Sequence, residues 1–224
     1  MPRELLIVGA GGLARETRQL VAVLPEWRPA GFLDDDPARH GSVIDGLPVL
    51  GGLEELARRP DAQVVICTAS PRDYASRARI VARLGLPPAR YATLVHPTAS
   101  VSPSSSIGPG SVLLACTVLT ASVRVGAHAV VMPHVTLTHD DVIEDFVTIA
   151  SGVRLGGTVR VEAGAYLGAG ALIREGRTIG PGALIGMGAV VTRDVPAGEV
   201  WIGAPARYLR PAPGSPSDPQ GDSR

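Results

Sequence analysis

The chain has 224 residues, of which 45% are apolar and only 4% aromatic. Lys plus Arg and Asp plus Glu both number 21, so the formal charge is zero, and nothing points to nucleic acid or an anionic membrane as a partner. Cys67 and Cys116 are too few for a disulfide scaffold or a zinc ribbon, so we expect a protein of the reducing cytoplasm.

The first 92 residues predict a small α/β domain. Residues 5–8 form an apolar run that is too short to span a membrane, and the glycine-rich segment 9–14 follows at once, which favours a buried strand over a signal peptide. A helical stretch comes next, then strands at 31–33 and 64–67 and a helix over 72–84. This βαβ order predicts a parallel sheet.

The glycine-rich segment fits the pattern G-x-G-x-x-A, with an acidic cluster at residues 34–36 about 20 residues further on, as in a dinucleotide-binding fingerprint. Glycines let backbone amides approach a phosphate at a helix start, and a carboxylate can hold ribose hydroxyls. A single match of this kind is a weak signal. The alternative is a tight strand-to-helix turn followed by a solvated acidic turn before Pro37.

The remainder of the chain is dominated by a repeat. From Val95 to Val191 an aliphatic residue stands at every sixth position, seventeen times without a slip, and the fourth place after each is mostly small or β-branched, with Asp141 and Arg177 as exceptions. A period of six fits neither a helix nor a simple strand but does fit short strands joined by corners. Three such sides close one coil, which predicts about 5–6 coils stacked at ~4.8 Å around an aliphatic column too narrow for aromatic side chains.

The repeat over about residues 95–205 resembles the hexapeptide-repeat family of left-handed β-helix proteins. The motifs at residues 8–12, 32–35, 138–140 and 203–207 stand in the order found in sialic acid O-acetyltransferases and UDP-4-amino-sugar N-acetyltransferases, to which the chain is similar. The resemblance implies three segments: a Rossmann-like acceptor-binding domain (1–92), a left-handed β-helix acyltransferase domain (93–210) and a tail (211–224). We expect the tail to be disordered because its composition offers nothing to bury.

The resemblance also implies where the ligands bind. In the family the nucleotide sugar is held by the glycine loop and the acidic strand end, and coenzyme A lies in a groove between neighbouring helices of a trimer. Carried over by position, the acceptor contacts are Gly11, Gly12, Asp34, Asp35 and Thr68, and the acetyl-CoA contacts are Thr148, Gly157, Ala169 and Met187.

His139 is the candidate general base. Acyl transfer from a thioester needs a group that takes a proton from the acceptor, and histidine suits neutral pH. Asp140 follows directly and can orient the imidazole, and counting one coil each way gives Ala121 and Gly157, whose small size leaves room for a ligand. The backbone amide of Gly157 is our candidate donor to the thioester oxyanion. The resemblance assigns the base role to His139 and the supporting role to Asp140; the alternative is a solvated corner histidine beside surface acids.

Together these observations predict an acetyl-CoA-dependent acyltransferase that acetylates the amino group of a nucleotide-linked sugar by direct transfer, as a homotrimer and without a metal. Three alternatives stay open. The acceptor could be a sugar hydroxyl or the acyl group longer. The protein could be a zinc enzyme of the β-helix carbonic-anhydrase type that uses His134 and His139. It could also be a non-catalytic nucleotide-binding trimer.

Overall fold

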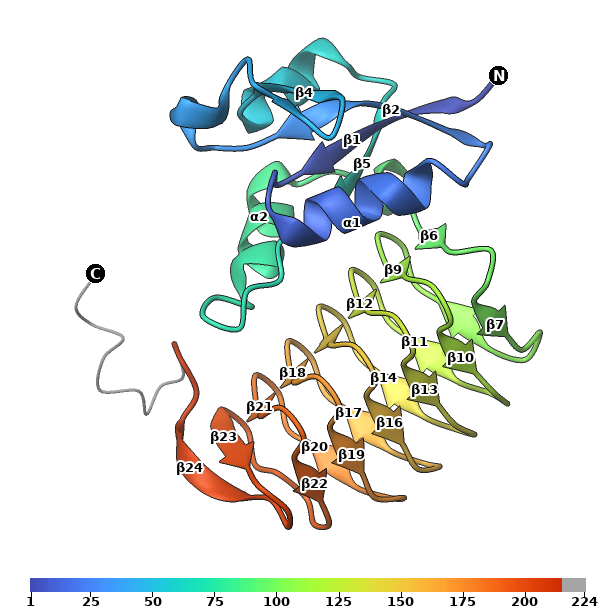
Figure 1. Cartoon of the computed structure of the whole chain (residues 1–224), viewed down its shortest axis with the longest axis vertical. Coiled ribbons are helices and arrows are strands. Elements are labelled where there is room, and N and C mark those ends of the chain that lie inside the picture. Colours follow the sequence, from blue (N-terminus) through green and yellow to red (C-terminus); the bar gives the residue numbers. More distant parts are fainter. Residues whose placement is uncertain (215–224) are drawn as a thin grey trace.

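The computed structural model describes residues 1–214, which form an α/β domain packed along one side of a three-sided coil (Figure 1). The domain sheet has the order β3-β4-β2-β1-β5, parallel except for the short edge strand β3. Its elements are β1 (Arg3–Val8), α1 (Gly12–Val21), β2 (Trp27–Leu33), η1 (Pro37–Arg39), β3 (Val43–Ile44), β4 (Leu47–Gly51), η2 (Leu53–Arg58), β5 (Gln63–Ile66), α2 (Ser76–Leu84) and η3 (Pro88–Arg90).

The predicted parallel sheet is therefore present, with two differences. The second helix begins at Ser76 and not at residue 72, because the segment before it folds into a turn closed by a bridge between Ser70 and Asp73. The strands β3 and β4 were not predicted, because they are short and neither is a continuous run of buried residues.

The coil is a left-handed β-helix of short parallel strands, as the six-residue period predicts. Strands on each side pair with strands eighteen residues away, for example Val118 with Thr136. The three sides are a six-stranded sheet (β22-β19-β16-β13-β10-β7), a five-stranded sheet (β20-β17-β14-β11-β8) and an eight-stranded sheet (β24-β23-β21-β18-β15-β12-β9-β6). Their bounds are β6 (Leu94–Val95), β7 (Ser100–Val101), β8 (Ser106–Ile107), β9 (Val112–Leu113), β10 (Val118–Leu119), β11 (Arg124–Val125), β12 (Val130–Val131), β13 (Thr136–Leu137), β14 (Val142–Ile143), β15 (Thr148–Ile149), β16 (Arg154–Leu155), β17 (Arg160–Val161), β18 (Tyr166–Leu167), β19 (Leu172–Ile173), β20 (Thr178–Ile179), β21 (Leu184–Ile185), β22 (Val190–Val191), β23 (Glu199–Ile202) and β24 (Arg207–Pro211).

The residues at every sixth position line the inside of this coil. From Leu113 to Val191 nearly all of them have no more than a few per cent of their surface exposed, and together with the small residues four places later they form one continuous apolar column. Burying each aliphatic side chain contributes about 1.5–3 kcal/mol, so the column supplies most of the stability of this domain.

Three rows of corners join the sheets, and we name each by one of its residues. The 139 corner joins the six- to the five-stranded sheet, the 128 corner joins the five- to the eight-stranded sheet, and the 187 corner joins the eight- to the six-stranded sheet. From Gly110 to Gly188 each turn places a residue in the left-handed region of the backbone map. Between residues 116 and 158 that residue is mostly not glycine, whereas later coils use glycine: Cys116, Ser122, His128, His134, Asp140, Phe146 and Thr158 against Gly164, Gly170, Gly176, Gly182 and Gly188.

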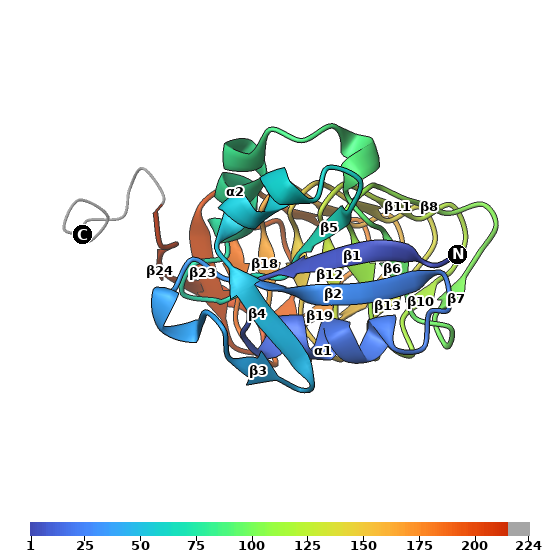
Figure 2. The same cartoon turned by 90° about the horizontal axis from the view of Figure 1, so that it is seen from above.

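The two domains are joined through α1 and α2, which lie between the sheet and the coil (Figures 1 and 2). Leu94, Val112 and Leu114 of the first coils belong to the same apolar cluster as α1. Arg77 of α2 has no exposed surface. Its guanidinium donates to the carbonyls of Thr68, His128, Phe146 and Val147 and to the hydroxyl of Thr148 over 2.7–3.2 Å. The Tyr74 hydroxyl adds a bond of 2.7 Å to the carbonyl of Gly182.

His128 is buried at this junction, where its ring stacks on Phe146 at 5.2 Å and meets the edge of Tyr91 at 4.5 Å. Burial, with a smaller effect from Arg77, lowers the pKa of His128 from 6.5 to about 4. Because the unfolded chain takes up this proton more readily, the stabilisation is present above pH 6.5 and is lost as the pH falls toward 4.

We therefore expect Tm to fall when the pH is lowered through this range, and to fall less steeply in the variant His128→Phe. Phenylalanine suits the site because Phe146 occupies the equivalent corner one coil later with the same positive φ. Thermal unfolding of both proteins between pH 7 and 4 checks this, since other titrating groups affect the two alike. Parallel pH profiles would contradict it.

The last strand changes one expectation. The segment from residue 211 was predicted to be disordered, but β24 pairs with β23 up to Pro211, and Ala212 is buried with its amide bonded to the carbonyl of Gly198 at 2.7 Å. The rest of that predicted tail, residues 215–224, lies outside the described residues. Within residues 1–214 no helix combines the length and the hydropathy needed to cross a bilayer.

Candidate functional site

His139 and Asp140 form an exposed pair on the 139 corner. The imidazole Nδ1 lies 3.0 Å from Oδ2 of Asp140, and the two side chains are 63% and 60% exposed. Asp140 holds φ at 63°, which turns its carboxylate back onto the ring. With Nδ1–H donating to Asp140, the lone pair of Nε2 is free to accept a proton from a ligand.

The other edge of the imidazole rests on Gly157, the residue one coil further on. A Cβ atom at position 157 would lie only 2.2 Å from Nε2 of His139. Only glycine fits here, as the coil count predicts, and any side chain would displace the ring. The Gly157 amide makes no hydrogen bond within the described residues, so it is open to an oxyanion.

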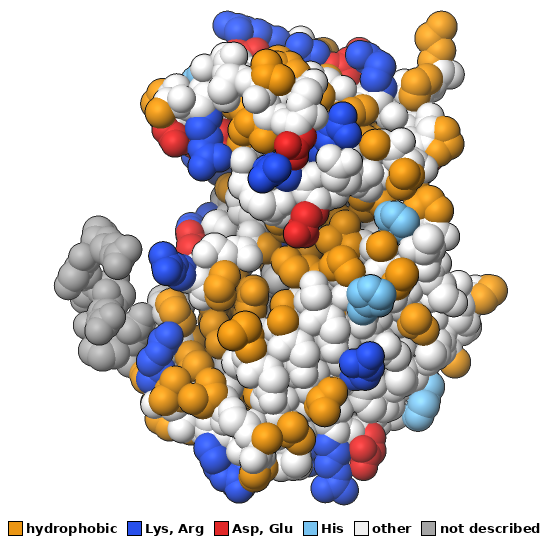
Figure 3. Space-filling model, viewed as in Figure 1, with side chains coloured by type: hydrophobic (Ala, Val, Ile, Leu, Met, Phe, Trp, Pro, Cys, Tyr) orange, Lys and Arg blue, Asp and Glu red, His pale blue; other side chains and the backbone are white. Residues whose placement is uncertain are grey.

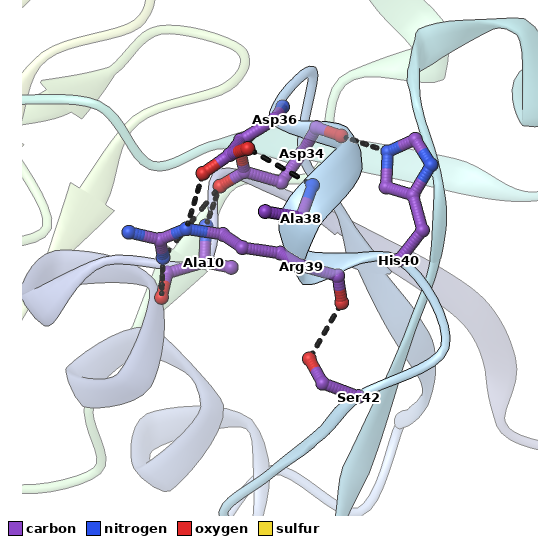
Figure 4. A network of polar contacts seen from close by, with 7 residues as sticks. All are labelled: Ala10, Asp34, Asp36, Ala38, Arg39, His40 and Ser42. Carbon is purple, nitrogen blue, oxygen red and sulfur yellow. Dashed lines mark hydrogen bonds and ion pairs between the residues drawn. The ribbon is translucent and has the colours of Figure 1, made fainter.

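The α/β domain contains a cavity of about 480 Å³, which lies where the glycine loop meets the carboxyl ends of β2 and β5. Figure 4 shows its acidic wall. Asp34 accepts from the amide of Ala10 at 2.9 Å and from the amide of Asp36 at 3.0 Å, while Arg39 donates to the carbonyl of Ala10 at 3.0 Å. Asp34 and Arg39 thus fix the glycine loop from opposite sides of one residue.

Four of the five predicted acceptor contacts line this cavity, namely Gly11, Gly12, Asp34 and Thr68. No atom lies within 4 Å of where a Cβ would stand on either glycine, so the start of α1 is open to an anion. Asp35 is different. It does not line the cavity, and its carboxylate pairs with Arg83 of α2 at 2.5 Å.

The sequence analysis missed four polar side chains of this cavity: Arg39, Ser70, Asp73 and Ser76. They stand on the connections that follow β2 and β5. Because ligands of parallel sheets bind beyond the carboxyl ends of the strands, the position of these connections was a usable signal.

The predicted acetyl-CoA contacts lie in three separate places. Gly157 is on the 139 corner, whereas Ala169 and Met187 are on the 187 corner, where Met187 is 81% exposed. Thr148 lies in the eight-stranded sheet with no exposed surface and accepts a bond from Arg77. The prediction for Thr148 therefore conflicts with its burial, because its side chain supports the domain junction and has no surface to offer a ligand.

Within one chain, the His139–Asp140 pair and the acceptor cavity lie apart. No residue of the 139 corner lines the acceptor cavity. Helices α1 and α2 cover the eight-stranded sheet and the 128 corner (Figure 2). His139 stands on the corner between the other two sheets, so it lies on a different flank of the coil from the cavity. The zinc alternative meets the same obstacle, since His134 and His139 stand on different corners, and residues 1–214 hold no cluster of three or more metal-ligating side chains.

Comparison with known proteins identifies the family. Residues 4–84 match the model of the PglD N-terminal domain. The acetyltransferase domain of PglB from Neisseria gonorrhoeae, solved with acetyl coenzyme A, is 31% identical, with a TM-score of 0.82 over 93% of this chain and 100% of that one. WeeI from Acinetobacter baumannii is 31% identical, with a TM-score of 0.81 over 92% of this chain and all of its own. The chain belongs to the hexapeptide-repeat acetyltransferases with a left-handed β-helix.

A further member of this acetyltransferase family, PerB from Caulobacter crescentus, was solved with CoA and GDP-perosamine. It is 27% identical, with a TM-score of 0.82 over 92% of this chain and 97% of that one. The sequence matches none of the curated proteins with which it was compared. The hexapeptide acetyltransferases that do match share both domains with this chain, so the α/β domain is part of the family architecture and not an addition to it.

Proposed function

We propose that this acetyltransferase moves an acetyl group from acetyl coenzyme A to the amino group of a nucleotide-linked sugar. The observation that carries the proposal is the exposed His139–Asp140 pair resting on Gly157, in a chain of this family. The relatives support both ligands, because the PglB domain was solved with acetyl coenzyme A and PerB with CoA and GDP-perosamine.

The chemistry follows from the tautomer that Asp140 selects. Nε2 of His139 takes a proton from the acceptor amine as its nitrogen attacks the thioester carbonyl, and the Gly157 amide donates to the oxyanion. The carbon–nitrogen bond forms, the carbon–sulfur bond breaks, and the imidazolium returns the proton to the leaving thiolate. Asp140 stabilises the charged imidazole throughout. The acetyl group passes directly, without a covalent acyl-enzyme.

We further propose that the site is completed by a neighbouring subunit of a homotrimer. Gly157 and Met187 can contact one ligand only if the 139 corner of one subunit faces the 187 corner of another, and the same arrangement can bring an acceptor cavity to His139. The surface supports this: exposed large apolar side chains gather toward the last coils (Figure 3), namely Leu172, Met187, Ile202, Tyr208 and Leu209.

The reaction is tested by offering acetyl coenzyme A with UDP-, dTDP- and GDP-linked 4-amino sugars and following thiol release and product mass. We expect release with at least one amino sugar and a product that resists hydroxylamine, because an amide survives where an ester is cleaved. A hydroxylamine-sensitive product would establish the sugar hydroxyl as the acceptor instead. Binding of a nucleotide sugar without thiol release would favour the non-catalytic alternative.

The acceptor cavity gives a paired prediction. Asp34→Ala removes the hydrogen bond that fixes the amide of Ala10 in the glycine loop, together with the bond to the amide of Asp36, and should raise KM for the nucleotide sugar about tenfold, with a smaller change in kcat. Asp35→Ala removes a carboxylate that faces Arg83 and should leave KM near the wild-type value. Steady-state kinetics of both variants decide the point, and an equal rise in KM would show that Asp35 also contacts the acceptor.

A further inference from the structure

Asp141 is a carboxylate inside the β-helix. It stands at the inward-facing fourth place after the aliphatic residue Leu137, has no exposed surface, and follows the His139–Asp140 pair directly. The same place in the coils before and after is filled by Val123 and Val159. Burial raises the pKa of Asp141 to about 6, against the opposing effect of the backbone amides of Val159 and Thr138. A buried acid in an aliphatic column is costly, so its presence calls for a function.

Both carboxylate oxygens of Asp141 are bound to backbone amides. Oδ2 accepts from the amide of Thr138 at 2.7 Å, and Oδ1 accepts from the amide of Val159 at 2.8 Å. The first bond closes the turn that carries His139. The second fastens this turn to the next coil, two residues after Gly157. One side chain therefore ties together the two backbone segments between which the imidazole lies.

The bond to Thr138 interrupts the β-helix ladder on this corner. In the equivalent places along this corner the amide donates to the next coil, as in Thr120 to Leu137 at 3.1 Å and Gly156 to Ile173 at 2.9 Å. The Thr138 amide turns to Asp141 instead, and the Thr138 hydroxyl takes over the carbonyl of Leu155 at 3.0 Å. Accordingly β13 and β16 pair through a single residue pair, where the other neighbours in this sheet pair through two.

We propose that Asp141 is a positioning residue, which displaces the Thr138–Asp141 turn from the regular ladder and thereby sets the His139 imidazole against Gly157. Asp141 touches neither substrate and acts only through the placement of His139. This inference rests on the proposed function, in which His139 is the base. It adds a condition that the six-residue pattern does not contain: at the corner that holds the base, the backbone hydrogen bonds must depart from the regular ladder.

The variant Asp141→Val tests this, because valine is what the coil already accepts at the same place in Val123 and Val159. Exchanging a buried acid for a fitting apolar side chain should leave Tm unchanged or raise it. We expect kcat to fall at least about tenfold while KM for both substrates stays within about twofold. A purely structural residue would give the opposite result, a lower Tm with activity per folded molecule retained.

The matched control is Ser105→Val. Ser105 occupies the same place on the same corner two coils earlier, and its hydroxyl accepts from the amide of Val123 at 3.0 Å, one coil on, just as Asp141 does from Val159. Replacing it removes a comparable bond between coils far from His139, so kcat should not change. Asp141→Val with kcat within about twofold of wild type, or with a lowered Tm, would overturn the proposal.

A crystal structure of Asp141→Val gives a readout that does not depend on finding the acceptor. We expect the Thr138 amide to return to the carbonyl of Leu155 and the imidazole to leave Gly157. An unchanged turn would overturn the inference even if the enzyme is active. Conversely, wild-type protein that releases no thiol with any amino sugar would refute the proposed function, while the structure of the variant would still decide the role of Asp141.

Discussion

Replacing His139 by alanine is expected to lower kcat about 10²–10⁴-fold, the usual contribution of a general base. The substitution removes the imidazole whose Nε2 lone pair is proposed to take the acceptor proton, while Asp140 and Gly157 remain in place. The side chain is 63% exposed and packs on glycine, so Tm and the assembly state should not change. Initial rates with saturating acetyl coenzyme A, together with thermal unfolding, check both parts of this expectation.

His134→Ala is the matched control for this experiment. His134 is also an exposed corner histidine within the same coils, but it stands on the 187 corner and has no carboxylate beside it. Because the proposed trimer turns the 187 corner toward a neighbouring subunit, any effect of this replacement should fall on KM for acetyl coenzyme A, and kcat should stay near wild type. If His139→Ala retained near-wild-type turnover in a protein of normal Tm, the imidazole would not be the base, and the mechanism proposed above would have to be abandoned.

Replacing Arg77 by methionine is expected to lower the free energy of unfolding by about 3 kcal/mol or more. The guanidinium satisfies buried carbonyls from both domains, and each acceptor left without a donor costs about 1–3 kcal/mol. Methionine keeps much of the volume, so the loss comes from the hydrogen bonds and not from a cavity. Urea denaturation measures the free energy of unfolding of the variant, and binding of a nucleotide shows whether its acceptor cavity is still formed.

Arg79→Met serves as the control on the same helix. Arg79 is 63% exposed and pairs with Asp73, and an exposed pair contributes only about 0–1 kcal/mol. The two variants remove the same charge from α2, so their difference isolates the buried hydrogen bonds. A loss for Arg77→Met no larger than that for Arg79→Met would show that the domains are held together by apolar contacts alone.

The spacing of aliphatic residues was sufficient to predict the β-helix because each place in a coil depends only on a count along the chain. The same count places Gly157 beside His139. It also places Ala169 and Met187 on another corner from Gly157, but it could not show which side of the coil the α/β domain covers.

Other residues depended on contacts from distant parts of the chain. Thr148 is buried because Arg77, far away in sequence, folds over it. Asp34 and Asp35 are adjacent acids that the sequence cannot tell apart, yet Asp34 faces the glycine loop and Asp35 faces α2. Asp141 appeared only as an exception to the pattern, and its role became visible when the ladder next to it proved to be interrupted.

The corners of the β-helix fall into two classes, and this division has a consequence for protein engineering. From Cys116 to Thr158 most corners force an ordinary residue into a left-handed backbone, whereas the later coils relieve that conformational cost with glycine. A heat-resistant form of the enzyme would begin with glycine or asparagine at exposed early corners such as Ser122. Asp140 must be left alone although its φ is also positive, because its carboxylate is the partner of the His139 imidazole: here the residue is set by what its side chain touches and not by the preference of its backbone.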